Sequence, residues 1–210
     1  MVPVMVCQTW PHRREPLRIG LTTISMKILS VDQESSLYQV SEVMPTDLVD
    51  AILHTEWQHL AKTKQAGQEN WSRSLIVESD LPWIEHWDAS MCELWPELEQ
   101  VLQTKLQPYG GTAFWMDPAG FVCPIHTDGE MPGSMQLNWI GHADLGTTFY
   151  YYRNPDSVKF KSIFAPNHGY VMINQQDQQG YRPLQWHGML VPVPMDTFRI
   201  TSYTWLIPVK

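Results

Sequence analysis

The sequence predicts a mostly β fold, a sandwich or jelly roll with helices packed outside it. Between residues 45 and 107, apolar residues recur at helical spacing. After Gly111 the segments become short and rich in β-branched and aromatic residues, and turn clusters such as "RNPDS" and "APNHG" separate them. Short strands at this spacing are typical of an all-β sandwich or jelly roll.

The length and composition predict one packed domain. The chain has 210 residues, of which 43% are hydrophobic and 17% are charged. We interpret residues 1–25 as an extension whose order the pattern does not define, and residues 26–210 as a single domain. Within that domain, residues 26–110 are expected to be mainly helical support and residues 111–210 the jelly-roll core.

Two helical regions are expected in the first half. The stretch "PTDLVDAILHTEWQHL" repeats apolar residues at helical spacing, and Thr46 is positioned to cap its start. A second helix is predicted to begin near Asp80, and Pro96 is expected to end it or to open the next one. The segment "PYGG" at residues 108–111 then stops the helical pattern.

Eight strands are expected after this point. The candidate strands lie near residues 112–116, 121–126, 135–140, 146–152, 158–164, 169–174, 186–191 and 197–207.

Charge and cysteine usage restrict the partners. The net charge is −8, so no global basic field attracts a phosphate backbone, and nucleic acid is not expected as a partner. The three cysteines are far apart and no CxxC occurs, which is typical of reduced thiols in a cytoplasmic protein. No apolar run approaches the ~18 residues that a membrane span needs, and we recognise no secretion signal.

A metal site is the first functional hypothesis, and it starts from "HTD". His126 and Asp128 are two residues apart at a strand end, so both side chains can lie on one face. A His-x-Asp triplet also arises by chance in a turn, and His187 in "LQWHGMLVPV" is the best candidate for a third ligand. Two imidazoles and one carboxylate on one side of a metal suit Fe(II), although Mn(II), Co(II) and Zn(II) accept the same ligands.

An anion site is expected beside this metal site. Arg199 lies on a predicted strand, and an arginine directed into an apolar interior requires an anionic partner. A dicarboxylate could supply that partner through a bidentate pair, and Thr201 would add a hydroxyl on the same face. Asn138 and Gln136 give another strand a polar face, which suggests hydrogen bonds to a ligand.

Several other residues have two interpretations. The candidate pocket residues Trp115, Tyr150 and Trp186 could equally be ordinary core residues. Cys123 could bind a metal as a thiolate, but a buried thiol is the preferred interpretation. Arg73 is interpreted as a surface or structural arginine and not as a substrate clamp.

The order of these motifs resembles the iron(II)- and 2-oxoglutarate-dependent oxygenases, in particular their prolyl-hydroxylase-like branch. The resemblance covers roughly residues 112–207 and rests on "DPAGFVCPIHTDG", "MQLNWI", "LGTTFYYY", "APNHGYVMIN" and "WHGMLVPV…FRITSYTW". It implies a double-stranded β-helix in which His126, Asp128 and His187 bind iron. It also implies that Arg199, helped by Thr201, binds the distal carboxylate of 2-oxoglutarate.

The resemblance further implies an activity and its reactants. The chain would couple decarboxylation of 2-oxoglutarate to hydroxylation of a small molecule or a peptidyl side chain, with dioxygen as co-substrate and ascorbate as a supporting reductant. The aspartate at Asp128 favours hydroxylation over halogenation, because halogenating relatives have a small residue there. One departure is Asp117, which stands where many relatives have a tyrosine that helps to hold the co-substrate. Asp117 is therefore a further candidate pocket residue.

Two other functions remain open at this level. The chain could be a metal-binding jelly roll of cupin type that uses no 2-oxoglutarate and does not require Arg199. It could also be an inactive interaction module that keeps only the barrel.

Overall fold

A computed structural model describes the protein over most of the chain from Met26 to Pro208. The described residues are 26–32, 37–60, 63–66, 72–76, 81–103, 105–126, 133–140, 148–154, 157–163, 165–173 and 186–208. The expected extension at residues 1–25 lies outside them.

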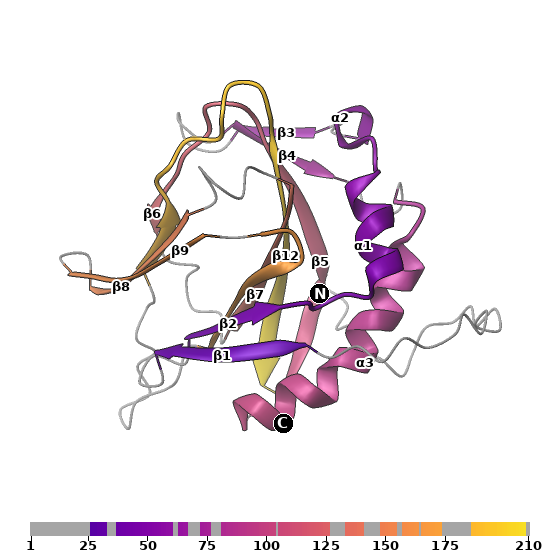
Figure 1. Ribbon diagram of the computed structural model, residues 1–210, viewed down its shortest axis with the longest axis vertical. Coiled ribbons are helices and arrows are strands. Elements are labelled where there is room, and N and C mark those ends of the chain that lie inside the picture. Colours follow the sequence, from indigo (N-terminus) through magenta and orange to yellow (C-terminus); the bar gives the residue numbers. More distant parts are fainter. Residues whose placement is uncertain are drawn as a thin grey trace.

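The described strands form two antiparallel sheets that face each other (Figure 1). The large sheet has eight strands in the order β1-β2-β10-β7-β12-β5-β4-β3, and the small sheet has four in the order β6-β11-β8-β9. The strands of the large sheet are β1 (Lys27–Asp32), β2 (Leu37–Ser41), β3 (Thr63–Ala66), β4 (Ser72–Ile76), β5 (Leu106–Asp117), β7 (Gly133–Ile140), β10 (His168–Ile173) and β12 (Arg199–Pro208). Those of the small sheet are β6 (Cys123–His126), β8 (Thr148–Asn154), β9 (Ser157–Ile163) and β11 (Trp186–Met189).

The eight strands predicted for the second half of the chain are confirmed as β5 to β12. The predicted mostly β fold with a jelly-roll core is likewise confirmed. The sequence pattern predicted these strands well, because turn residues stand on both sides of each short run of β-branched and aromatic side chains.

The first half of the chain contributes more strand than its pattern predicted. Strands β1 and β2 extend one side of the large sheet beyond β10, and the hairpin β3–β4 extends the other side beyond β5. The helical spacing of the apolar residues in and around α1 and α3 dominated the prediction for this half of the chain. The hairpin β3–β4 matters for the site, because it places one side chain there.

The helices cover the face of the large sheet that is turned away from the small sheet (Figure 1). They are α1 (Thr46–Leu53), α2 (Trp57–Leu60) and α3 (Ile84–Leu102). The expectation for Thr46 was wrong, because the cap residue is Pro45 and no side chain caps α1. The expectation that Pro96 ends a helix was also wrong, because α3 continues through it. Leu94 and Leu98 are both buried against the core, and this packing holds the helix together on either side of the proline.

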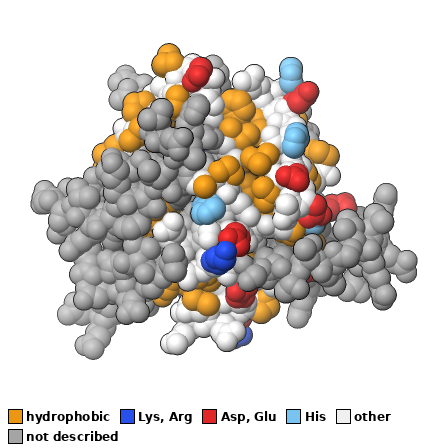
Figure 2. Space-filling model, viewed as in Figure 1, with side chains coloured by type: hydrophobic (Ala, Val, Ile, Leu, Met, Phe, Trp, Pro, Cys, Tyr) orange, Lys and Arg blue, Asp and Glu red, His pale blue; other side chains and the backbone are white. Residues whose placement is uncertain are grey.

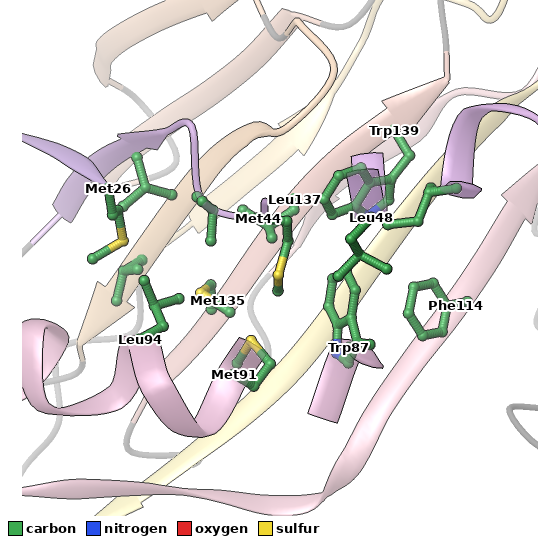
Figure 3. Close-up of a cluster of buried hydrophobic side chains, with 14 of the residues drawn as sticks. Met26, Met44, Leu48, Trp87, Met91, Leu94, Phe114, Met135, Leu137 and Trp139 are labelled. Carbon is green, nitrogen blue, oxygen red and sulfur yellow. The ribbon is translucent and has the colours of Figure 1, made fainter. Parts of the chain in front are cut away.

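The main core lies between these helices and the large sheet. Alternating residues of β7, namely Met135, Leu137 and Trp139, pack there against Trp87 and Met91 of α3 (Figure 3). Trp87 meets Trp139 edge-to-face, with ring centroids 5.3 Å apart. The polar residues Ser134, Gln136 and Asn138 alternate with them along β7 and therefore face the small sheet. The apolar face of the large sheet thus packs against the helices, and its opposite face offers polar side chains for a site.

On the face of the molecule that Figure 2 shows, acidic and hydrophobic side chains of the described residues lie side by side. This distribution agrees with the net charge of −8. None of the described helices is both long enough and apolar enough to span a membrane.

Candidate active site

A cavity of about 250 Å³ lies between the two sheets. Its walls come from β4, β5, β7 and β12 of the large sheet and from β6 and β11 of the small one. The lining residues are Arg73, Ala113, Trp115, Cys123, His126, Gln136, His187, Gly188, Met189, Arg199, Thr201, Tyr203 and Trp205. Two histidines and two arginines therefore share one cavity in a chain whose overall charge is negative.

The two histidines are brought together by strand pairing. His126 ends β6, His187 lies on β11, and the two residues are direct partners in the antiparallel register. Their ring centroids are 4.4 Å apart. The Nδ1 atom of His126 lies 2.9 Å from the carbonyl oxygen of Pro124, and this carbonyl can only accept a hydrogen bond. Nδ1 of His126 therefore carries the proton, which leaves Nε2 with the lone pair that a metal ligand needs.

Gly188 allows this close approach of β11 to β6. A Cβ atom at position 188 would lie 2.8 Å from the carbonyl oxygen of Cys123 and 2.9 Å from that of Pro124. Both contacts are with backbone, so they could be relieved only by moving one strand away from the other. The glycine that follows His187 in the sequence therefore sets the distance between the two imidazoles.

The third predicted metal ligand, Asp128, lies outside the described residues. Within the described part of the chain, no group of three His, Cys, Asp or Glu side chains forms a metal-binding cluster. The assignment of Asp128 stays a prediction. Cys123 is buried, as the preferred interpretation had it, and its sulfur lies 3.8 Å from Nδ1 of His126.

Arg199 begins β12 and is only 2% exposed. Its Nε and Nη2 atoms donate to one oxygen of Asp117, Oδ2, at 2.8 and 2.7 Å. Asp117 is fully buried at the end of β5 and is the direct partner of Arg199 in the sheet. The Nη1 atom of Arg199 is buried and has no hydrogen-bond partner among the described residues. Because an unpaired buried donor is costly, this atom marks a position where a ligand acceptor fits.

Arg73 is the second arginine of the cavity, and it comes from β4. Its Nε donates to Oδ1 of Asp117 at 2.5 Å, and its Nη2 donates to Oγ1 of Thr201 at 3.2 Å. The side chain of Arg73 is 20% exposed. Of the two alternatives in the interpretation, surface or structural, the structural one agrees with this part-buried ion pair.

Asn138 is a buried amide on the polar face of β7. Neither its Oδ1 nor its Nδ2 has a hydrogen-bond partner among the described residues. It does not line the cavity, although it pairs in register with Thr201, which does. A ligand or an ordered water would satisfy such an amide, so its predicted role in co-substrate binding stays a prediction.

The remaining pocket candidates divide into three groups. Trp115 lines the cavity, and its role in binding a substrate stays a prediction. Trp186 does not line the cavity, because strand alternation turns its side chain to the face opposite that of His187. Asp117 does not line the cavity either, because the side chains of the two arginines lie between its carboxylate and the cavity. The side chain of Tyr150 lies outside the described residues.

Sequence reasoning missed Arg73 as a cavity residue. Its signal was the short run "SRSLI", in which Arg73 and Leu75 alternate with the buried Ser74 and Ile76. A strand reading of this run would have placed Arg73 on the same sheet face as Trp115, which is the register partner of Leu75.

The donor set fits both groups that the resemblance implies. Two adjacent imidazoles, one of them with its Nδ1–H bonded to a backbone carbonyl, are suited to a divalent transition metal. Two guanidinium groups around one carboxylate leave a local excess of one positive charge, which is suited to an anion.

Comparison with known proteins gives a clear result for the fold. No family model and no curated protein matches the sequence. Among solved structures, the viral collagen prolyl hydroxylase of Paramecium bursaria Chlorella virus 1, in its complex with 2OG, is similar with a TM-score of 0.58 and 10% identity. The alignment covers 83% of this chain and 97% of that one.

Two further structures are similar at the same level. A Pseudomonas putida prolyl-4-hydroxylase has a TM-score of 0.56 and 16% identity, over 81% of this chain and 92% of that one. The non-heme alpha ketoglutarate dependent epimerase SnoN from nogalamycin biosynthesis has a TM-score of 0.58 and 10% identity, over 83% and 79% of the two chains. The chain therefore has the jelly-roll fold of the 2-oxoglutarate-dependent oxygenases, and the resemblance is confirmed at the level of the fold.

Proposed function

We propose that this protein is an Fe(II)- and 2-oxoglutarate-dependent oxygenase that hydroxylates a small molecule or a peptidyl side chain. The observation that carries the proposal is the meeting of two imidazoles, 4.4 Å apart, with a buried arginine in one cavity. The fold similarity supports the same class, because prolyl hydroxylases and other 2-oxoglutarate-dependent enzymes have this architecture. Such a protein would act in the cytoplasm, with dioxygen as a reactant and ascorbate as a supporting reductant.

Each residue has a definite task in this proposal. His126 and His187, with Asp128, would hold Fe(II), which supplies the dioxygen chemistry when it is bound. The hydrogen bond from Nδ1 of His126 to the Pro124 carbonyl fixes the tautomer that presents Nε2 as a ligand. Arg199 would bind the distal carboxylate of 2-oxoglutarate through its unpartnered Nη1.

The cavity wall also has a role. Trp115 and Tyr203 are aromatic residues of the lining, and the tight pairing of β11 with β6 closes one side of the cavity. Restricting water in this way strengthens the electrostatic interactions of the arginines and protects reactive species from side reactions.

A second candidate function is favoured by one observation. Arg199 already has a buried carboxylate partner in Asp117, so it does not require a ligand to neutralise its charge. A metal-binding jelly roll of cupin type that uses no 2-oxoglutarate would be compatible with this arrangement. The two candidates differ in whether 2-oxoglutarate binds and turns over.

Succinate production from 2-oxoglutarate tests the first candidate. The purified protein is incubated with Fe(II), ascorbate and air, and succinate is compared among wild type, His187→Ala, Arg199→Ala and the surface variant Lys105→Gln. We expect succinate from wild type and Lys105→Gln, and at least a 100-fold lower rate from the other two. Binding of metal and 2-oxoglutarate is measured in parallel by calorimetry with Mn(II) in place of iron.

The outcomes separate the candidates. If metal binds but 2-oxoglutarate does not, and Arg199→Ala changes nothing, the cupin-type function replaces the oxygenase. If neither metal nor 2-oxoglutarate binds, both enzyme proposals fail and the inactive module remains.

A further inference from the structure

The cluster of Arg73, Asp117 and Arg199 contains one more cation than the resemblance to oxygenases leads one to expect. Three neighbouring strands supply it, namely β4, β5 and β12. Oδ2 of Asp117 is paired with Nε and Nη2 of Arg199 and also accepts a longer bond of 3.5 Å from Nη2 of Arg73. Oδ1 accepts a bond from Nε of Arg73. One fully buried carboxylate is thus held between two guanidinium groups.

Arg73 determines the net charge of the cluster. Arg199 and Asp117 together are neutral, so with these two alone a carboxylate ligand would approach an arginine that is already compensated. Arg73 raises the count to +1, since two guanidinium groups face one carboxylate. Both arginines line the cavity and Asp117 does not, so the ligand side of the cluster presents the cations.

Asp117 also determines which edge of Arg199 is available. It occupies the edge formed by Nε and Nη2 and leaves Nη1 without a partner among the described residues. A guanidinium group has five N–H donors in a rigid plane, so holding one edge fixes the direction of the other.

Aromatic rings hold the second guanidinium group in place. The Cζ atom of Arg73 lies 5.0 Å from the ring centroid of Trp115 and 5.5 Å from that of Phe121. Phe121 also lies 5.8 Å from Cζ of Arg199. Cation–π contacts at these distances, together with the bond to Thr201, restrict how far Arg73 can turn.

We infer that Arg73 is a second anion-binding residue of this cavity, which acts through the positive charge that it adds to the neutral pair of Asp117 and Arg199. The ligand group is a carboxylate, and its affinity depends on the +1 charge of the whole cluster and not on Arg199 alone. The inference rests on the proposed function in one respect, namely that the carboxylate is the distal one of 2-oxoglutarate.

The test measures binding and needs no turnover. Glutarate is the first probe, because it is a dicarboxylate without the keto acid that binds a metal. Its dissociation constant is measured by calorimetry for wild type, Arg73→Gln, Arg73→Lys, the double variant Arg73→Gln/Asp117→Asn, and Lys105→Gln as a surface charge control. Circular dichroism and thermal unfolding check that each variant folds.

We expect affinity to follow the charge of the cluster. Arg73→Gln lowers the charge to zero and should weaken glutarate at least tenfold. Arg73→Lys and the double variant both keep a charge of +1, so both should bind within about threefold of wild type. Arg73→Gln leaves Asp117 partly unpaired and could fail to fold for that reason. The lysine and double variants would then still test whether affinity depends on the charge of the cluster. A tenfold loss in either would overturn the inference, as would unchanged binding by a folded Arg73→Gln.

A second comparison separates the distal carboxylate from other anions. In the Mn(II)-loaded protein, Arg73→Gln should weaken 2-oxoglutarate and leave 2-oxopentanoate unchanged, because 2-oxopentanoate has a methyl group in place of the distal carboxylate. The lysine and double variants should bind both ligands as wild type does. An equal loss for both ligands would show that Arg73 acts through the metal end or the fold, and would overturn the inference. Failure of Mn(II) to bind would count against the proposed function, while the metal-free glutarate series would still decide the role of Arg73.

Discussion

Residues that would not bind the metal help to set the geometry of this site. Gly188 allows β11 to approach β6, and the carbonyl of Pro124 fixes the tautomer of His126. Neither residue supplies a side-chain atom that could bind a metal. The metal affinity of such a site depends on how well supporting contacts preorganise its ligands.

The first residue-scale prediction concerns Gly188→Ala. The added Cβ would lie 2.8 Å from the Cys123 carbonyl oxygen, so β11 should move away from β6 and separate the two imidazoles. We expect Mn(II) to bind about 10–100-fold more weakly, in the range seen when supporting residues of metal sites are changed. Calorimetric titration measures this, and Leu190→Ala, an exposed neighbour, is the control. Unchanged affinity with an intact fold would show that the strands can separate elsewhere.

At the scale of elements, helix α3 carries Asp88, whose surroundings disfavour its charged form. Burial, and secondarily the nearby Glu85 carboxylate, raise the pKa of Asp88 from 3.8 to about 6. The folded state then holds this proton more tightly than the unfolded state does. The contribution of Asp88 to stability is therefore greatest below pH 4 and is lost as the pH rises through about 6.

Asp88→Asn should accordingly stabilise the protein at pH 7.5 and not at pH 4. Asp88 is only half-buried, so solvent screening reduces the gain to about 1 kcal/mol in the free energy of unfolding. Urea denaturation at the two pH values measures the gain, and Glu93→Gln on the exposed side of the same helix is the control. An equal gain at both pH values would mean that removal of the charge is not the cause.

Element patterns also explain what the sequence could predict. The strands β5 to β12 were predictable because turn residues bound each of them, and His126, His187 and Arg199 followed from their order along these strands. The hairpin β3–β4 was not predictable, because it lies between helices in a region where the helical pattern dominated. For that reason Arg73 was not predicted as a cavity residue. The pairing of Asp117 with Arg199 is a contact between strands 82 residues apart, and no local pattern contains it.

At the scale of the whole molecule, ligand binding should appear as added stability. A ligand present at 100 times its dissociation constant stabilises the folded state by about 2.7 kcal/mol. For a chain of this size, that corresponds to a rise of about 5–10 °C in Tm. We expect Mn(II) to raise Tm, 2-oxoglutarate to raise it further, and EDTA to reverse both increases in thermal unfolding followed by calorimetry.

Arg199→Ala is the matched variant for this measurement. It should keep the increase due to Mn(II) and lose the increase due to 2-oxoglutarate. A wild-type protein that responds to Mn(II) but not to 2-oxoglutarate would support the cupin-type alternative.

The ion cluster between the sheets has a consequence for the history of this fold. Asp117 and Arg199 compensate each other's charge, whereas Arg73 lies against the same carboxylate and without it would face the guanidinium group of Arg199 unpaired. The two positions should therefore covary among homologous chains. Where the position of Asp117 holds an uncharged residue, the neighbouring hairpin β3–β4 should lack the arginine.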